Sequence, residues 1–245
     1  MRKLKIMLQE DLDKNNYTMA KLFIESEYLH DEILEMARLV KIQLVKIKNL
    51  LSDFDEDLAR EIMMNERRIN AQELKIDRDC ENILALYNPV AIDLRFVIAA
   101  LKINTNLERM GDNAESIAKY TLNGALPFDK GMITDYQIDK MVDVTIIILD
   151  DTLDALEQKD TNIARRVFTN DEVLNEINKK VIEYTIKRIN EDPIRIRQHL
   201  YMSSIVHKLE RIGDHAKNIA EEIIFYLEAN VLKHNKEAKR INEQE

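Results

Sequence analysis

Acidic side chains recur in pairs that share one helix face in two parts of this 245-residue chain. Glu108 and Asp112 are four residues apart, as are Glu210 and Asp214, and this spacing places both members on one face of an α-helix. An earlier segment of each part supplies two more oxygen-bearing side chains: Glu66 with Asn70, and Asp171 with Asn175. Carboxylate and carboxamide oxygens bind hard or borderline cations, so iron, zinc, manganese or magnesium would suit these residues.

Distances along the chain predict that each set of four meets. Glu66 and Asn70 precede residue 88 by 22 and 18 positions, and Glu108 and Asp112 follow it by 20 and 24. In an antiparallel helix pair, both sets then lie roughly 30 Å from the turn. The second set has the same relation to residue 192. Carboxylates this close repel one another unless a cation lies between them, so metal binding is favoured over a merely solvated acidic face.

His207 is a further candidate ligand, because it precedes Glu210 by three residues on the same helix face. The alternative interpretation is a solvated polar side chain, since the matching position of the first set is Thr105. Arg95 and Arg197 also match between the two parts. They would either bind an anion or anchor a helix through a salt bridge.

An internal repeat explains why the acidic pairs occur twice. LERMGDNAESIAKY (107–120) and LERIGDHAKNIAEE (209–222) are identical at eight of fourteen positions, and residues 51–70 align with 156–175. The repeat predicts an all-α protein of two tandem, pseudo-symmetric three-helix bundles. We assign residues 1–124 to repeat 1, residues 125–131 to a linker and residues 132–245 to repeat 2.

Helical periodicity and chain breakers indicate where the helices lie. The expected segments are 17–51, 55–87, 90–122, 132–157, 160–190 and 193–232, with Pro89 and Pro193 in turns or first helical turns. Apolar residues at helical spacing, such as Leu209, Ile212, Ala216 and Ile219, form the inward seam. Gly111 and Gly213 interrupt the best helices, which predicts a close approach by a neighbouring helix.

Composition narrows the functional classes. The formal net charge of −9 argues against nucleic acid as a partner. The single cysteine, Cys80, allows no internal disulfide, which fits a cytoplasmic protein and predicts a small buried side chain. The amino-terminal sequence does not have the pattern of a signal peptide, and no apolar run approaches the length of a membrane span.

The doubled LERxGDxA motif, together with NPVAIDLR (88–95), resembles the PhoU family of bacterial phosphate-uptake regulators over essentially the whole chain. The resemblance implies surface metal clusters at Glu66, Asn70, Glu108 and Asp112, and at Asp171, Asn175, Glu210 and Asp214. It implies a cytoplasmic accessory of the phosphate ABC transporter that contacts the transporter's ATPase subunit and the phosphate sensor histidine kinase. Such a protein would be peripheral to the membrane through these partners, and the resemblance also allows a homodimer.

The leading hypothesis is therefore a metal-binding regulatory adaptor rather than an enzyme, which represses phosphate uptake and phosphate-starvation signalling. The alternative is a carboxylate-bridged metal enzyme or metal store of the helical-bundle type. Such enzymes use two ExxH motifs. The sequence contains Glu27-Tyr28-Leu29-His30 and no second copy, so we interpret that string as a coincidence.

Overall fold

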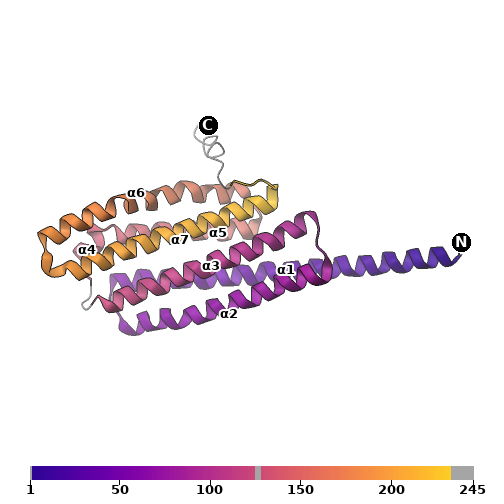
Figure 1. Ribbon diagram of the computed structural model, residues 1–245, viewed down its shortest axis with the longest axis horizontal. Helices are drawn as coiled ribbons and strands as arrows, with labels where there is room; N and C mark the ends of the chain where they lie inside the picture. Colours follow the sequence, from indigo (N-terminus) through magenta and orange to yellow (C-terminus); the bar gives the residue numbers. More distant parts are fainter. Residues whose placement is uncertain (1, 125–127, 233–245) are drawn as a thin grey trace, which may run out of the picture.

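The computed structural model describes residues 2–124 and 128–232, with side chains from residue 16 onward (Figure 1). Within these ranges the chain forms seven α-helices, one 3-10 turn (η1) and no β-strand. Repeat 1 contains α1 (Arg2–Ser52), α2 (Glu56–Tyr87) and α3 (Ala91–Asn123). The second half contains α4 (Lys130–Asp135), α5 (Ile138–Gln158), α6 (Thr161–Glu191), η1 (Pro193–Arg195) and α7 (Ile196–Glu228). The predicted all-α fold with two three-helix repeats is confirmed.

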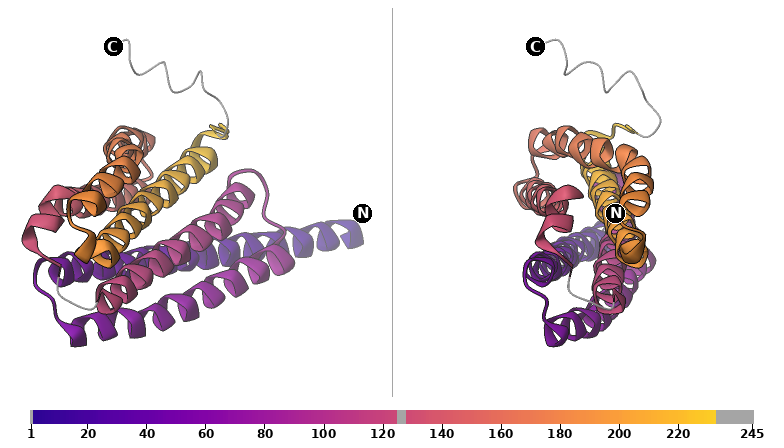
Figure 2. Two further views of the ribbon diagram at one scale, coloured as in Figure 1. Left: turned by 60° about the vertical axis from the view of Figure 1, so that its left-hand side comes forward. Right: turned by 90° about the vertical axis from the view of Figure 1, so that its left-hand side faces the viewer.

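The two bundles pack along their lengths. Figure 1 shows α3 and α7 side by side between the outer helices, α2 lying beside α3 and α6 beside α7. A second contact joins α1 to α5, and the end-on view in Figure 2 shows the two bundles stacked on each other. Each repeat therefore has one outer helix pair, α2 with α3 or α6 with α7, and we call the line of contact between the two helices its groove.

Aspartate side chains cap the first turns of the two outer helices. The Asp55 side chain caps α2 by accepting hydrogen bonds from the backbone N–H groups of Asp57 and Leu58. Its match in repeat 2, Asp160, caps α6 by accepting from Asn162 N. Each bond satisfies an amide that the first helical turn leaves unpaired.

Both prolines in the described residues stand where the sequence predicted them. Pro89 lies between α2 and α3, directly after Asn88, which ends α2 in the left-handed conformation at φ 48°. Pro193 opens η1, where its missing N–H disrupts no helical hydrogen bond.

The predicted apolar seam is the core. Leu209, Ile212, Ala216 and Ile219 are all buried on α7. The matching residues of α3 are buried as well: Leu107, Met110, Ala114 and Ile117. Glu108 and Asp112 lie between the seam positions of α3 and face α2, and Glu210 and Asp214 lie between those of α7 and face α6.

The helices differ from the prediction at several places, including the end of α7, which lies at Glu228 rather than at residue 232. α1 begins at Arg2 rather than near residue 17, and its amino-terminal part projects beyond the bundle (Figure 1). The segment expected at 132–157 is divided, because Gln137 adopts a left-handed conformation between α4 and α5. Of the expected linker 125–131, residues 125–127 lie outside the described residues, and Lys130 and Gly131 already belong to α4. No helix in the described residues has the length and apolar character needed to span a membrane.

Candidate functional site

The predicted residues of repeat 1 lie along the groove between α2 and α3. We call this set the first stripe; it comprises Glu66, Asn70, Glu73, Glu108, Asp112 and Glu115. The two helices run antiparallel, so the charge of Glu73 lies close enough to raise the pKa of Glu108. In the same way, Asp112 and Glu115 raise the pKa of Glu66. The structure therefore brings the four predicted residues together and adds Glu73 and Glu115.

Burial makes this groove costly for negative charge. Glu66 is only 9% exposed, and its pKa is raised first by burial and then by Glu115 and Asp112. Burial and the neighbouring Asp112 raise the pKa of Glu108 to about 7. Glu66 and Glu108, whose side chain is 14% exposed, thus lie between two packed helices, where a charge loses much of its hydration, whereas Asp112 at 40% stays accessible to solvent.

Asn70 Oδ1 of the first stripe is buried and lacks a hydrogen-bond donor within the described part of the chain. Glu108 Oε2 is also buried without a hydrogen bond, but it forms an ion pair with Arg109 Nε at 3.4 Å. Buried oxygens without a donor are uncommon, because their lost hydration is normally replaced. Two cationic side chains partly balance the charge. Arg109 lies 3.4 Å from Glu108 and 3.2 Å from Asp112, and Lys119 lies 2.6 Å from Glu115. The donors of this set are oxygens, which are the ligands that hard cations prefer.

The equivalent groove of repeat 2 lies between α6 and α7. We call this set the second stripe; it comprises Asp171, Asn175, Asn178, Glu210, Asp214 and Lys217. Asp171 is buried at 1% exposure, and burial raises its pKa while Lys217 opposes that change. Lys217 Nζ lies 2.8 Å from Asp171 and 3.1 Å from Asp214. A lysine thus stands among the predicted ligands.

Sequence reasoning missed Glu115 and Lys217, although a signal for both exists. Each residue follows the motif aspartate by three positions, Asp112 in repeat 1 and Asp214 in repeat 2. Residues three positions apart share a helix face, as do residues four positions apart. The 14-residue motif alone could therefore have placed Glu115 and Lys217 on the stripes.

The predicted close approach at the two internal glycines is confirmed. A Cβ on Gly111 would lie 2.9 Å from Ile69 Cδ1. A Cβ on Gly213 would clash with Leu174 Cδ1 and lie 3.2 Å from Asp171 Oδ1. The glycines therefore let α2 approach α3, and α6 approach α7, closely enough for the acids of both helices to meet.

Within ranges 2–124 and 128–232, no three or more His, Cys, Asp or Glu side chains are grouped so that they could hold a metal ion. His207 is half-buried on α7. Metal binding by either stripe, and ligation by His207, stay predictions.

Comparison with known proteins identifies the fold. The family described as PhoU domain matches twice, at residues 33–121 and 138–223. The chain belongs to the PhoU family. It is 35% identical over 207 residues to a phosphate-specific transport system accessory protein PhoU homolog from a Burkholderia species, covering 83% of this chain and 87% of the relative.

Two solved PhoU structures share the architecture. The crystal structure of PhoU from Pseudomonas aeruginosa superposes with a TM-score of 0.78 at 30% identity, covering 84% of this chain and 99% of that one. PhoU from Streptococcus pneumoniae, described as a phosphate transport system regulatory protein, gives a TM-score of 0.76 at 25% identity, with coverage of 86% and 99%. The PhoU assignment thus spans both repeats and both stripes.

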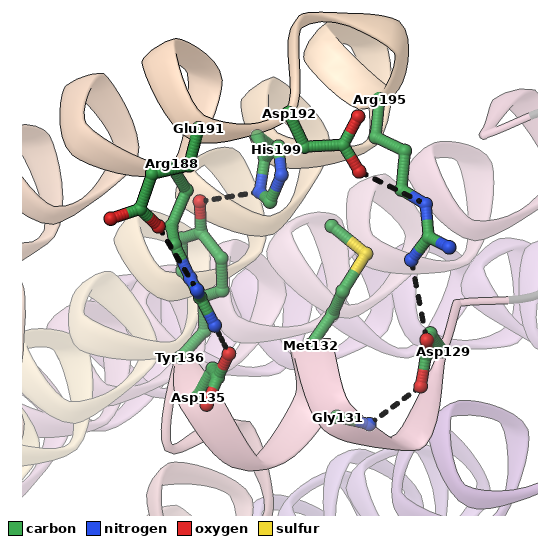
Figure 3. A pocket seen from close by; sticks show the side chains of 10 residues that line it. All are labelled: Asp129, Gly131, Met132, Asp135, Tyr136, Arg188, Glu191, Asp192, Arg195 and His199. Atoms are coloured by element: carbon green, nitrogen blue, oxygen red, sulfur yellow. Dashed lines mark hydrogen bonds and ion pairs between the residues drawn. The ribbon is translucent and has the colours of Figure 1, made fainter.

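A second polar region of this PhoU fold lies where α4 meets the α6–α7 turn. A cavity of about 260 Å³ lies there, and Figure 3 shows that two arginines in its lining each contact two acids. Arg188 pairs with Asp135 and Glu191, whereas Arg195 pairs with Asp129 and Asp192. Because four carboxylates surround two guanidinium groups, the cavity repels phosphate rather than attracting it. We interpret these ion pairs as the attachment of α4 to the second bundle.

Other residues singled out in the sequence make structural contacts. Arg95 Nε donates a hydrogen bond to the carbonyl oxygen of Tyr226 at 3.2 Å, which anchors α3 to the end of α7, while Arg197 is exposed. His30 Nε2 lies 3.1 Å from the carbonyl oxygen of Leu156, and Glu27 pairs with Lys159 at 3.6 Å. The single ExxH string therefore serves the contact between α1 and the end of α5.

Cys80 is buried as predicted. Burial raises the pKa of its thiol to about 12, so the reactive thiolate is scarce at neutral pH.

Proposed function

We propose that this protein is an accessory regulator of phosphate uptake, which acts by binding other proteins. The observation that carries the proposal is the similarity across both repeats to accessory proteins of phosphate-specific transport systems. The proposed partners are the ATPase subunit of a phosphate ABC transporter and the phosphate sensor histidine kinase. The protein would meet both at the cytoplasmic side of the membrane and restrain uptake and starvation signalling when phosphate is plentiful.

We further propose that the stripes contribute to this docking by binding metal ions. Glu66, Asn70, Glu108 and Asp112 would hold an ion in repeat 1, with Glu73 and Glu115 close by. A bound cation supplies positive charge that offsets crowded carboxylates and can bridge to an acidic or phosphorylated partner group. The support is the buried Asn70 Oδ1, which has no hydrogen-bond donor among the described residues, and the buried Glu108 Oε2, whose contact is an ion pair with the exposed Arg109. The donor set also consists of oxygens only.

The regulatory role is tested by deleting the gene for this protein from its host and measuring alkaline phosphatase in phosphate-rich medium. Loss of a repressor should raise the activity, and the wild-type chain should restore repression. Unchanged phosphatase activity in the deletion strain would count against the regulatory role.

The contribution of the stripes is tested by complementing the same strain with altered chains. Glu108→Gln and Asp112→Asn together keep the shape of these side chains and remove two negative charges, so the fold should survive. Their failure to restore repression, with normal protein levels, would support a signalling role for the first stripe. Thr105→Ala, an exposed change on the same helix, serves as the control that should restore repression fully.

A further inference from the structure

The two stripes differ in charge although the repeats that carry them match. Repeat 1 has Glu73 and Glu115 where repeat 2 has Asn178 and Lys217. The exchange is reciprocal at one position, since Lys119 of repeat 1 matches a glutamate, residue 221, in repeat 2. The first stripe therefore contains five carboxylates, while the second contains three carboxylates and an ammonium group.

Lys217 lies among the acids of the second stripe rather than at its margin. Its side chain is 20% exposed and contacts the buried Asp171 and the half-exposed Asp214. Asp171 Oδ2 also accepts a hydrogen bond from Asn175 Nδ2 at 3.0 Å, so that oxygen already has two donors. The ammonium thus takes the position between two carboxylates that a metal ion would need.

The cations near the first stripe are placed differently. The Arg109 side chain is 55% exposed and reaches Glu108 and Asp112 from the solvent side. Because an exposed arginine can move into solvent at little cost in free energy, it does not prevent a cation from reaching Glu108 and Asp112. Lys217 has no such freedom, because its departure would leave the buried carboxylate of Asp171 without its cation.

We infer that Lys217 is the built-in cation of the second stripe and that it excludes added metal ions from repeat 2. The inference takes from the proposed function only the premise that the first stripe binds metal. A divalent ion in repeat 2 would face an ammonium within about 3 Å of shared ligands, and like charges at that separation repel strongly. Asp171 Oδ1 and Asn178 Oδ1 are buried without a hydrogen-bond donor among the described residues. A metal ion bound to these two oxygens would overturn the inference.

The experiment measures Mn²⁺ binding, by the loss of the free-ion EPR signal, in single-stripe proteins. The double variant Glu108→Gln, Asp112→Asn disables the first stripe. With Lys217 present, this protein should bind no Mn²⁺. Adding Lys217→Glu, which installs the repeat 1 residue, should produce Mn²⁺ binding at least about tenfold tighter than any residual binding of the parent. Lys217→Met, which removes the ammonium without adding a carboxylate, should produce a smaller gain.

Thermal unfolding checks that each variant folds. Without Mn²⁺ the Lys217→Glu chain should melt at a lower temperature than its parent. Added Mn²⁺ should raise the melting temperature of the Lys217→Glu chain more than that of the parent. Lys119→Gln in the same background is the matched control and should produce no Mn²⁺ binding.

The outcomes separate the inference from its premise. Mn²⁺ binding that survives loss of the first stripe and disappears with Asp214→Asn would overturn the exclusion by Lys217. A folded Lys217→Glu variant with no gain in binding would overturn it as well. If wild type binds no Mn²⁺ and Lys217→Glu does, the inference stands and the metal premise for repeat 1 fails.

Discussion

Asn113 Oδ1 accepts a hydrogen bond from Lys208 Nζ at 3.1 Å across the contact between α3 and α7. Exchanging each residue for its match in the other repeat gives His215 and Asn106, and His215 Nδ1 lies 2.9 Å from Asn106 Oδ1. The two contacts are therefore related by a pseudo-twofold axis that passes between the antiparallel helices. The same axis relates the first stripe to the second, which makes their difference in charge a property of side chains rather than of the backbone.

Gly213→Leu should destabilise the protein by about 1–3 kcal/mol or more, because the new side chain would overlap Leu174 and the carboxylate of Asp171. Chemical denaturation measures the change. Thr105→Leu, at an exposed position of α3, is the control and should have little effect or stabilise slightly through helix propensity. A higher melting temperature for Gly213→Leu would show that α6 does not constrain this position.

Arg109→Gln should tighten Mn²⁺ binding by roughly fivefold, because Glu108 and Asp112 lose a competing cation whose exposed ion pairs are worth about 1 kcal/mol. Isothermal titration calorimetry provides the affinity. Arg211→Gln, the matching change on α7, should leave the affinity unchanged. Weaker binding by Arg109→Gln would mean that the guanidinium supports the site instead of competing for it.

His199 should make stability sensitive to acid. Burial lowers its pKa and Arg188 and Arg195 act in the same direction, whereas Asp192 raises it. Its ring also lies 3.1 Å from the hydroxyl of Tyr136 (Figure 3). Because the folded-state pKa lies below the unfolded value of 6.5, the unfolded chain takes up the proton first. The stability contribution is complete above about pH 6.5 and is lost as the pH falls toward the folded-state pKa.

His199→Gln should therefore flatten the dependence of the free energy of unfolding on pH between pH 7 and pH 5. Urea denaturation at a series of pH values measures that slope. The slope matters here rather than the absolute stability, since the substitution also changes the contact with Tyr136. A variant slope equal to that of wild type would assign the acid sensitivity to other groups.

Asp55→Ala and Asp160→Ala should each destabilise by about 1 kcal/mol through loss of a helix cap. Asp53→Ala removes the same charge from an exposed aspartate outside the helix and should have a smaller effect. Equal melting temperatures for Asp53→Ala and Asp55→Ala would show that the cap bonds contribute nothing beyond charge.

The sequence predicted most of the fold because its signals are local and occur twice. Asp55 and Asp160 mark two helix starts, Pro89 and Pro193 mark two turns, and the seams repeat in register. The break at Gln137 was missed because glutamine carries none of the left-handed preference of glycine or asparagine. Tertiary packing, rather than any local pattern, sets such a position.

The candidate site was predicted less completely. Antiparallel geometry placed Glu66 beside the Asp112 region, since residue counts from the turn determine height along a helix. Burial of Glu66 and Asp171 could not be read from a helical wheel, because it depends on how closely the partner helix approaches at each glycine. The role of Lys217 depends on its contact with α6, which the spacing on α7 does not reveal.

The pseudo-twofold axis has an evolutionary consequence. In a dimer of identical three-helix chains, every substitution appears on both sides of the axis, so the two grooves can only change together. Joining both halves in one polypeptide removes that constraint, because each half then mutates separately while the α3–α7 contact persists. The pairing of a glutamate at 115 with a lysine at 217 is a difference that a dimer of identical chains does not permit.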